Sequence, residues 1–245
     1  MRYDIADILE VRDLSRFLAM MQEEFEETIG SRRFFRITAT SHDLGQVSAD
    51  VDSIDLRQVL ENPPNPNGRF SGWVVKPLGG LRRTALGLQN EKFDYHHLRF
   101  IRNGHLEFWT EVDENFCWRQ DAESLKKNPR LYPYAVVEYP VSFVRLYQVL
   151  QSFLNIKVHV TFQMQYLNIR GAILLPYQPE SISFQHPVDP VIPFDKDRLL
   201  FPKKDFPNDY EPDPVALELI KDLYNAFGFG REHIPFFDQT GHCKL

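Results

Sequence analysis

Cysteine is scarce in this sequence, with only Cys117 and Cys243 among 245 residues. Two thiols so far apart cannot supply a disulfide framework or a four-thiolate metal site, so the composition favours a reducing compartment. No apolar run approaches the roughly 20 residues that a helix needs to cross a bilayer. The start of the chain carries acids where an export signal is basic and then apolar. We therefore expect a cytoplasmic protein with no membrane contact.

Positive charge is also scarce, since the formal net charge is -6 at pH 7. Coating nucleic acid by bulk electrostatics needs many Lys and Arg to neutralise phosphates, so this mode is disfavoured, whereas a local basic patch is compatible with the charge. Apolar residues, in contrast, make up 43% of the sequence and include 20 phenylalanines. This is enough for a full hydrophobic core, so disorder is not expected.

The signatures of common enzymes are missing. Gly79-Gly80 is the only glycine pair, and the Lys-Ser or Lys-Thr of a phosphate-binding loop does not follow it. The sequence also lacks a Gly-x-Ser-x-Gly elbow, a His-Glu-x-x-His zinc helix and a Cys-x-x-Cys pair. Motifs therefore assign no catalytic residue, no metal site and no cofactor, and the expectation leans toward a chain that is not an enzyme.

The N-terminal segment predicts a helix, because Asp13 is a suitable N-cap and Gly30 is placed to end it. Between them, apolar residues recur at three- and four-residue steps: Leu14, Phe17, Leu18, Met21, Phe25 and Ile29. We interpret the other face as a solvated acidic surface, made of Glu23, Glu24, Glu26 and Glu27.

Strands are expected next, over residues 33–40 and 46–51, with a turn at His42-Asp43 between them. A tight hairpin then follows, because Asn103-Gly104 favours the positive backbone angles of such a turn. Its two strands would cover residues 95–102 and 105–111.

The register of this hairpin follows from the length of its turn. A turn of two residues would place Ile101 opposite Leu106 and Leu98 opposite Trp109. Both faces of the hairpin would then carry apolar pairs, which implies that each face is covered.

In the second half, Pro140 can open a helix that runs to Leu154. Strict alternation over 156–166 predicts a long half-buried strand, and the short apolar run 172–175 is expected to pair with it. Nine prolines between 176 and 214 make regular structure improbable there. A last helix then begins at Asp213-Pro214 and stops at Gly228.

Together these elements predict an α+β fold in which a mostly antiparallel sheet is covered by one main helix, with peripheral N- and C-terminal helices. The expected organisation is a helical segment over 1–30, an α+β core over 31–205, and a C-terminal helix and tail over 206–245. The sequence contains no internal repeat.

The best candidates for chemistry lie around the predicted hairpin: Asp94, His96, His97, Glu107 and Glu111. The carboxylates and one histidine would suit a metal-dependent nuclease or phosphoesterase. Alternation along a strand sends His96 and His97 to opposite faces, so at most one of them can join such a cluster. The simpler interpretation is a polar strand end, and we expect polar groups to be dispersed and not gathered into one cleft.

Nucleic acid is a second possible partner. Arg32, Arg33 and Arg36 near the first strand, with Arg82 and Arg83 after the Gly-Gly turn, are the candidate contacts, and the two adjacent pairs are the ones expected to bind phosphate. They would bind phosphates while a neighbouring phenylalanine stacks on a base. Short basic pairs are also common as solubilising charges.

Three segments of the chain carry a family resemblance. They are the hairpin sequence at 98–109, the helix and strand over 137–175 with the turn at Gly171, and the end, Leu-Tyr-Asn-Ala-Phe-Gly at 223–228 followed by Phe-Asp-Gln-Thr-Gly at 237–241. In order and spacing they resemble the C-terminal region of bacterial proteins that carry a Schlafen-type AlbA module and are described as DNA-binding or ATP-binding. In that family the AlbA module, with its acidic and lysine site residues, precedes this region. Residues 1–30 do not match such a module, so no catalytic residue transfers.

We therefore expect a non-enzymatic interaction domain, an accessory part of a multi-component bacterial system that is nucleic-acid-directed or related to defence. It would bind a protein partner through apolar surfaces and phosphate through the four arginines. Two alternatives stay open. One is the nuclease or phosphoesterase described above, and the other is a small-ligand sensor with a pocket between the hairpin and the proline-rich stretch.

Overall fold

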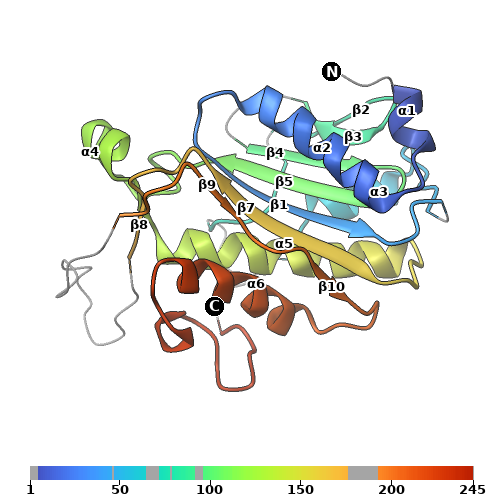
Figure 1. Ribbon diagram of the computed structural model, residues 1–245. Coiled ribbons are helices and arrows are strands. Elements are labelled where there is room, and N and C mark those ends of the chain that lie inside the picture. The colour runs from blue at the N-terminus through green and yellow to red at the C-terminus, as the bar shows by residue number, and fades with distance from the viewer. Residues whose placement is uncertain are drawn as a thin grey trace.

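An antiparallel sheet between two helical layers organises the chain (Figure 1). The computed structural model describes residues 5–45, 47–64, 72–77, 79–91, 96–175 and 193–244. The strands follow across the sheet in the order β10 (Lys204–Phe206), β7 (Val160–Leu167), β1 (Phe34–Ser41), β5 (His105–Glu111), β4 (His96–Ile101), β3 (Gly87–Asn90) and β2 (Leu81–Arg83). β9 (Arg198–Leu200) pairs with β7 outside this path.

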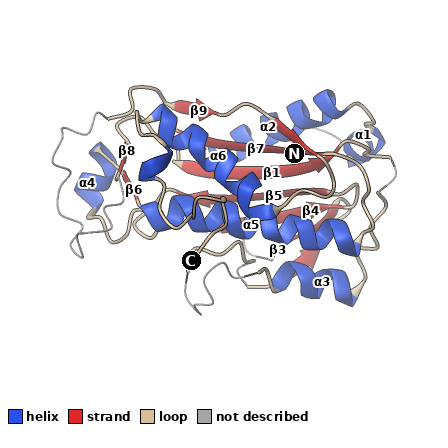
Figure 2. Ribbon diagram, turned by 90° about the horizontal axis from the view of Figure 1, so that it is seen from below, coloured by secondary structure: helices blue, strands red, loops and turns tan. Residues whose placement is uncertain are grey.

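Helices cover both faces of the sheet. α2 (Leu14–Ile29) lies on one face, and α5 (Pro133–Phe153), with α6 (Pro212–Ala226) packed beside it, lies on the other (Figure 1, Figure 2). The predicted α+β class, with one main helix and peripheral helices at the ends of the chain, is confirmed. No helix within the described ranges is long and apolar enough to cross a membrane.

The N-terminal helix forms as its capping residues predict. The Asp13 side chain accepts a hydrogen bond from the backbone N–H of Arg16 at 2.7 Å. Gly30, with φ of 58°, ends the helix in a conformation that suits glycine. A short helix, α1 (Ile5–Glu10), precedes α2. Phe17, Met21 and Phe25 of α2 are buried, so the apolar stripe faces the sheet.

The main helix begins earlier than the sequence suggested. α5 starts at Pro133, which occupies its first turn, whereas Pro140 lies inside it. The predicted start at Pro140 was wrong because both prolines suit a first turn, and only packing distinguishes them. Nearly the whole first half of α5 is buried, so tertiary contacts outweigh the backbone hydrogen bond that Pro140 cannot donate.

The hairpin register differs by one residue from the prediction. Ile101 pairs with His105, and Arg99 pairs with Glu107, so three residues and not two form the turn. Gly104, with φ of 88°, donates its N–H to the carbonyl of Ile101 at 2.9 Å. The longer turn places Glu107 opposite a cation, where the predicted register would have placed it opposite Phe100.

The later strands are shorter and pair differently from the prediction. β7 begins at Val160, not at Ile156. Residues 172–175 do not pair with β7, because β8 (Ile173–Leu174) runs parallel to β6 (Arg130–Leu131) in a separate small sheet. The proline-rich stretch contributes β9 and β10 to the edge of the main sheet, so the expectation of no regular structure there was wrong for these residues. Residues 176–192 lie outside the described residues.

Several helical elements went unrecognised. Residues 47–51 form no strand, and α3 (Ile54–Glu61) follows instead, with the Ser53 hydroxyl capping the N–H of Leu56 at 3.3 Å. Leu56 and Leu60 of α3 join the main core. α4 (Ala122–Lys127) and a short 3-10 turn, η1 (Arg231–His233), complete the described elements.

Alternate residues of each strand point to opposite faces of the sheet. On β1, Phe35 and Ile37 belong to the core shared with α5 and with Leu219 of α6. Arg36, between them in sequence, instead donates a hydrogen bond to the backbone of α2. The sheet therefore has an apolar face under α5 and a face with charged residues under α2.

Candidate functional site

Charged side chains gather beneath α2 in what we term the charged layer: Arg36, Arg99, Glu107 and Glu24. Arg36 donates from Nη2 and Nε to Glu107 Oε2 at 2.6 and 3.1 Å. Arg99 donates from Nε to Glu107 Oε1 and from Nη1 to Glu24 Oε1, the latter at 3.0 Å. The first three residues are buried. Some polar groups are therefore gathered and not dispersed, but they form a buried ion-pair network and not an open cleft.

Helix α2 completes this layer with its own polar groups. Gln22 accepts hydrogen bonds through Oε1 from Arg36 and from Gln165 of β7, both at 2.8 Å. Glu26 forms a bidentate ion pair with Arg198. The predicted solvated acidic surface is thus only partly solvated, because Glu24 and Glu26 bind arginines of the sheet. The helical pattern alone did not show which strand residues would face α2.

The chemistry of Glu107 is that of a structural anion. Burial alone would raise its pKa, but attraction to Arg99 and Arg36 outweighs burial and holds the pKa well below its usual value. Both carboxylate oxygens already accept guanidinium donors. Glu107 is therefore ionised but occupied, and no group of three His, Cys, Asp or Glu within the described ranges is arranged to hold a metal.

The structure separates the other residues of the predicted nuclease cluster. His96 points to the α5 face, where it is 3.1 Å from the Tyr139 hydroxyl, and His97 points to the α2 face, stacked on Trp109. Glu111 pairs with Arg32 at the end of the hairpin, at 3.6 Å. Asp94 lies outside the described residues. Burial lowers the pKa of both histidines to about 4, so each is neutral at pH 7.

The four candidate arginines lie in two places. Arg33 donates to the carbonyls of Leu125 and Lys126 at the end of α4. Arg82 and Arg83 lie on β2, four strand spacings from β1, which corresponds to about 19 Å across the sheet. The two pairs therefore form separate surfaces, and their contact with nucleic acid stays a prediction.

His42 and Asp43 form the predicted turn. The Asp43 carboxylate accepts the backbone N–H of Gly45 at 3.1 Å, as expected of a side chain that bonds within its own turn. His42 Nε2 lies 2.8 Å from the hydroxyl of Thr161 and 3.1 Å from Asp205. The hydroxyl of Thr161 donates to the same Asp205 oxygen at 2.5 Å, so this cluster links β7 to the edge strand β10.

A pocket of about 400 Å³ opens beside the charged layer. Its lining comes from α2 and the neighbouring strands: Glu24, Glu27, Thr28, Gln89, His97, Arg99 and Trp109. It lies between the hairpin and α2, not between the hairpin and the proline-rich stretch. The small-ligand sensor stays a prediction.

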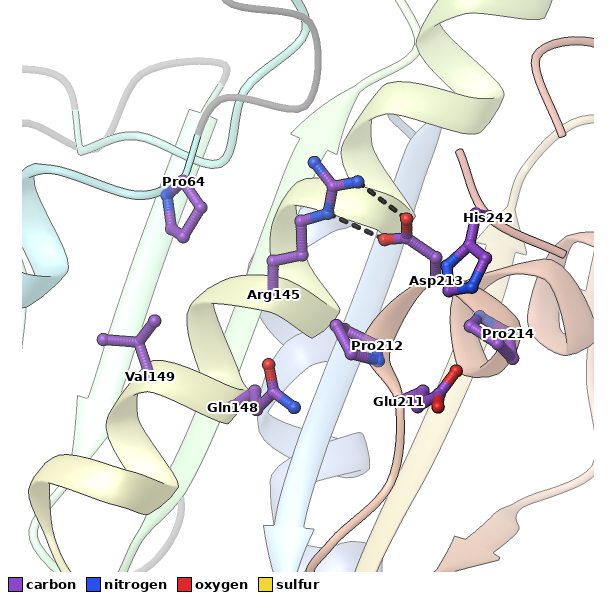
Figure 3. A pocket seen from close by; sticks show the side chains of 9 residues that line it. All are labelled: Pro64, Arg145, Gln148, Val149, Glu211, Pro212, Asp213, Pro214 and His242. Atoms are coloured by element: carbon purple, nitrogen blue, oxygen red, sulfur yellow. Dashed lines mark hydrogen bonds and ion pairs between the residues drawn. The ribbon is translucent and has the colours of Figure 1, made fainter. Parts of the chain in front are cut away.

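A second pocket, of about 350 Å³, lies between α5 and the start of α6 (Figure 3). Arg145 and Asp213 form a bidentate ion pair in it, with distances of 2.7 and 2.8 Å. Pro64 and Val149 lie on one side of Arg145, and His242 lies beyond Asp213 on the other. Burial opposes ionisation of Asp213, but the hydrogen bond from Arg145 contributes to a net lowering of its pKa.

An aromatic cluster near α4 was not recognised from the sequence. Trp118 stacks on Tyr132 with ring centroids 5.4 Å apart and an interplanar angle of 10°. Trp73 contacts both rings, and Tyr134 extends the cluster. The residues come from three separate segments of the chain, so no local pattern links them. In the sequence, the feature that could have pointed to this cluster was Trp118-Arg119, a large aromatic residue next to a cation.

No protein-family model, no curated protein and no solved structure matches this chain. The resemblance to Schlafen-type proteins therefore stays an expectation drawn from the sequence.

Proposed function

We propose that the chain is an interaction domain without catalytic activity of its own, an accessory part of a multi-component system. A protein partner docks in the pocket between α5 and α6. The observation that carries this proposal is the exposed apolar surface beside that pocket. Val149, which lines it, is 41% exposed, and Phe153, one helical turn further, is 43% exposed. Large apolar side chains that stay open next to a concave site are typical of interaction surfaces.

The pocket is preformed, which favours binding because little order must be gained. The Arg145–Asp213 pair joins α5 to α6, and the backbone N–H of Cys243 donates to Asp213 at 3.0 Å. Gln148 donates to the carbonyl of Tyr210 at 3.0 Å, which holds the chain entering α6. These contacts fix the lining of the pocket, so an apolar side chain of a partner can pack against Val149 without rearrangement of α5 or α6.

The charged layer supports a binding role over catalysis. Its anion Glu107 is enclosed by two arginines and covered by α2, so it cannot reach a substrate without loss of both ion pairs. His97 is neutral at pH 7 and buried. These groups hold α2 on the sheet, and the apolar surface beside Val149 lies on the opposite face.

The proposal is tested by co-expression with the products of neighbouring genes, above all an AlbA-like or nuclease subunit. We expect one of them to co-purify in a fixed ratio. Val149→Asp should weaken that complex about thirtyfold or more, because it places a charge in an apolar contact. Ile54→Asp is the matched control, since Ile54 is 68% exposed on another helix.

Equal loss with both variants, or no complex with any neighbouring product, would contradict the proposal. The nuclease or phosphoesterase alternative has its own test, which is titration with Mn²⁺ followed by calorimetry. Saturable binding that His97→Gln removes would favour the enzyme over the interaction domain.

A further inference from the structure

The backbone at Trp118 is unusual for a residue of its size. Trp118 and Arg119 have φ of 50° and 58°, so two successive residues with large side chains adopt the left-handed region. Such residues rarely occur there, and they concentrate at sites where ligands bind. Trp118 is also 49% exposed. The fold therefore holds an indole at the surface in a conformation that its own backbone disfavours.

Specific hydrogen bonds maintain this conformation. Asp113 accepts the N–H groups of Asn115 and Phe116 at 2.9 and 3.0 Å, which closes the turn before Trp118. Arg119 then donates its N–H to the carbonyl of Glu114 at 2.7 Å. The loop is thus fixed in place, and Trp118 does not move freely.

A second segment is tied to the same loop through Gln120. Its amide nitrogen donates to the carbonyl of Asn128 at 2.7 Å, and its oxygen accepts the N–H of Arg130 at 2.8 Å. Gln120 therefore lies beside residues 128–130. Tyr132 lies two residues after Arg130, and its ring stacks on the Trp118 ring.

This surface carries cations that the described chain does not neutralise. The exposed side chains of Arg119, Lys127 and Arg130 have no hydrogen bond or ion pair within the described ranges. The Arg119 guanidinium lies 5.3 Å from the Trp118 ring centroid, as in a cation–π contact. Each of its N–H groups is therefore available to an anion.

The acids of the same region are largely occupied. Asp113 and Asp121 cap backbone N–H groups, and Glu123 lies 3.4 Å from Lys126. Only Glu114 has no hydrogen bond or ion pair from its side chain in the part of the chain that the structure describes. Against a net charge of -6 for the whole protein, this end presents a local excess of positive charge that no acid in the described ranges pairs with.

We propose that this surface binds single-stranded nucleic acid. A base stacks on the exposed part of Trp118, and neighbouring phosphates contact Arg119, Lys127 and Arg130. An aromatic ring at the surface, among cations that make no ion pair within the described residues, is the kind of arrangement by which proteins bind single strands without reading sequence. A duplex keeps its bases stacked inside, so it would use the cations but not the indole. This site is independent of the pocket beside α5.

The experiment is fluorescence anisotropy of a labelled oligothymidylate, measured over a range of salt concentrations. We expect saturable binding that Trp118→Ala weakens about tenfold or more, while Trp118→Phe, which keeps a stacking ring, loses less. Arg119→Gly should lower the slope of log affinity against log salt by about 0.7, the contribution of one phosphate contact on a single strand. The same variant should keep or raise the melting temperature, because glycine adopts a φ of 58° freely.

The matched control is the double variant Lys157→Ala and Lys203→Ala, two exposed lysines that precede β7 and β10, which should leave the affinity unchanged. Val149→Asp should also leave it unchanged, which separates this proposal from the protein-binding pocket. Absence of binding at low salt would overturn the inference. So would full affinity in Trp118→Ala.

Discussion

The face of the sheet under α5 and the face under α2 are both closed to water, but by different chemistry. Under α5, large apolar side chains such as Phe143, Tyr147 and Phe162 fill the space. Under α2, Glu107 lies between Arg36 and Arg99, and the polar side chain of Gln22 joins the helix to them. Close packing of apolar side chains stabilises the α5 face, and ion pairs between buried charges stabilise the α2 face.

This difference shows what holds the strands in register. On the apolar face, exchanging one apolar neighbour for another of similar size costs little free energy, because the hydrophobic effect is not directional. On the charged face, a slip of one residue would turn Glu107 toward α5 and leave two buried arginines without their anion. The charged layer therefore adds a penalty for errors of register to the one that burial of the apolar face already imposes.

The largest expected effect is on Glu107. Glu107→Gln keeps the shape of the side chain but leaves Arg36 and Arg99 without a charge partner, so it should destabilise the fold by about 3 to 5 kcal/mol. The measurement is urea denaturation at pH 7. Met164→Leu, a change of similar size on the apolar face, should cost less than about 1.5 kcal/mol. If Met164→Leu were the more damaging, the two faces would not differ as described.

The next effect concerns acid, and it compares one histidine on each face. Burial lowers the pKa of His96 and of His97 from 6.5 to about 4. The unfolded chain therefore takes up protons below pH 6.5 that the folded chain refuses until about pH 4, so stability falls as the pH drops through this window. Each histidine should account for about 2 kcal/mol between pH 7 and pH 5.

Denaturation curves recorded at steps between pH 7 and pH 5 check this prediction. His96→Gln and His97→Gln should each flatten the dependence of stability on pH. If only His97→Gln did so, the sensitivity to acid would belong to the charged face alone. An unchanged slope in both variants would show that neither buried histidine resists protonation.

The smallest effect concerns two hydroxyl groups on the α5 side. Tyr147 donates to the buried carbonyl of Gly104 at 3.0 Å and so ties α5 to the hairpin turn. Tyr147→Phe should cost about 1 kcal/mol, because that carbonyl loses its donor. The hydroxyl of Tyr224 is buried with no hydrogen-bond partner in the described residues, so Tyr224→Phe should be neutral or stabilising. Thermal unfolding of both variants measures the contrast.

Much of the fold was predictable where the signal was local. The Asp13 cap, the Gly30 stop and the apolar stripe between them lie within one helix, and all formed as expected. The predictions were wrong where contacts between segments far apart in the sequence determine the structure. Pro133 and Pro140 suit a first turn equally well, and only burial against the sheet selects Pro133.

The candidate sites were less predictable than the fold. Arg36 and Glu107 are 71 positions apart in sequence, so no spacing rule joins them. Trp118 and Tyr132 are 14 positions apart, and Gln120 binds the segment before Tyr132, so their contact depends on pairing between two segments. The pocket between α5 and α6 forms only when α6 packs on α5, and the helical pattern of either segment does not specify that packing.

By itself the sequence determined the α+β class, the capped N-terminal helix and the presence of a hairpin at Asn103-Gly104, because these depend on neighbouring residues. The tertiary structure alone decided the three-residue turn, the pairing of Arg99 with Glu107 and the surface at Trp118. The Asn103-Gly104 pair suits a turn of two residues as well as one of three, so the local sequence does not select the observed turn. What separates them is the charge that each register buries, and that is known only when α2 and the sheet are in contact.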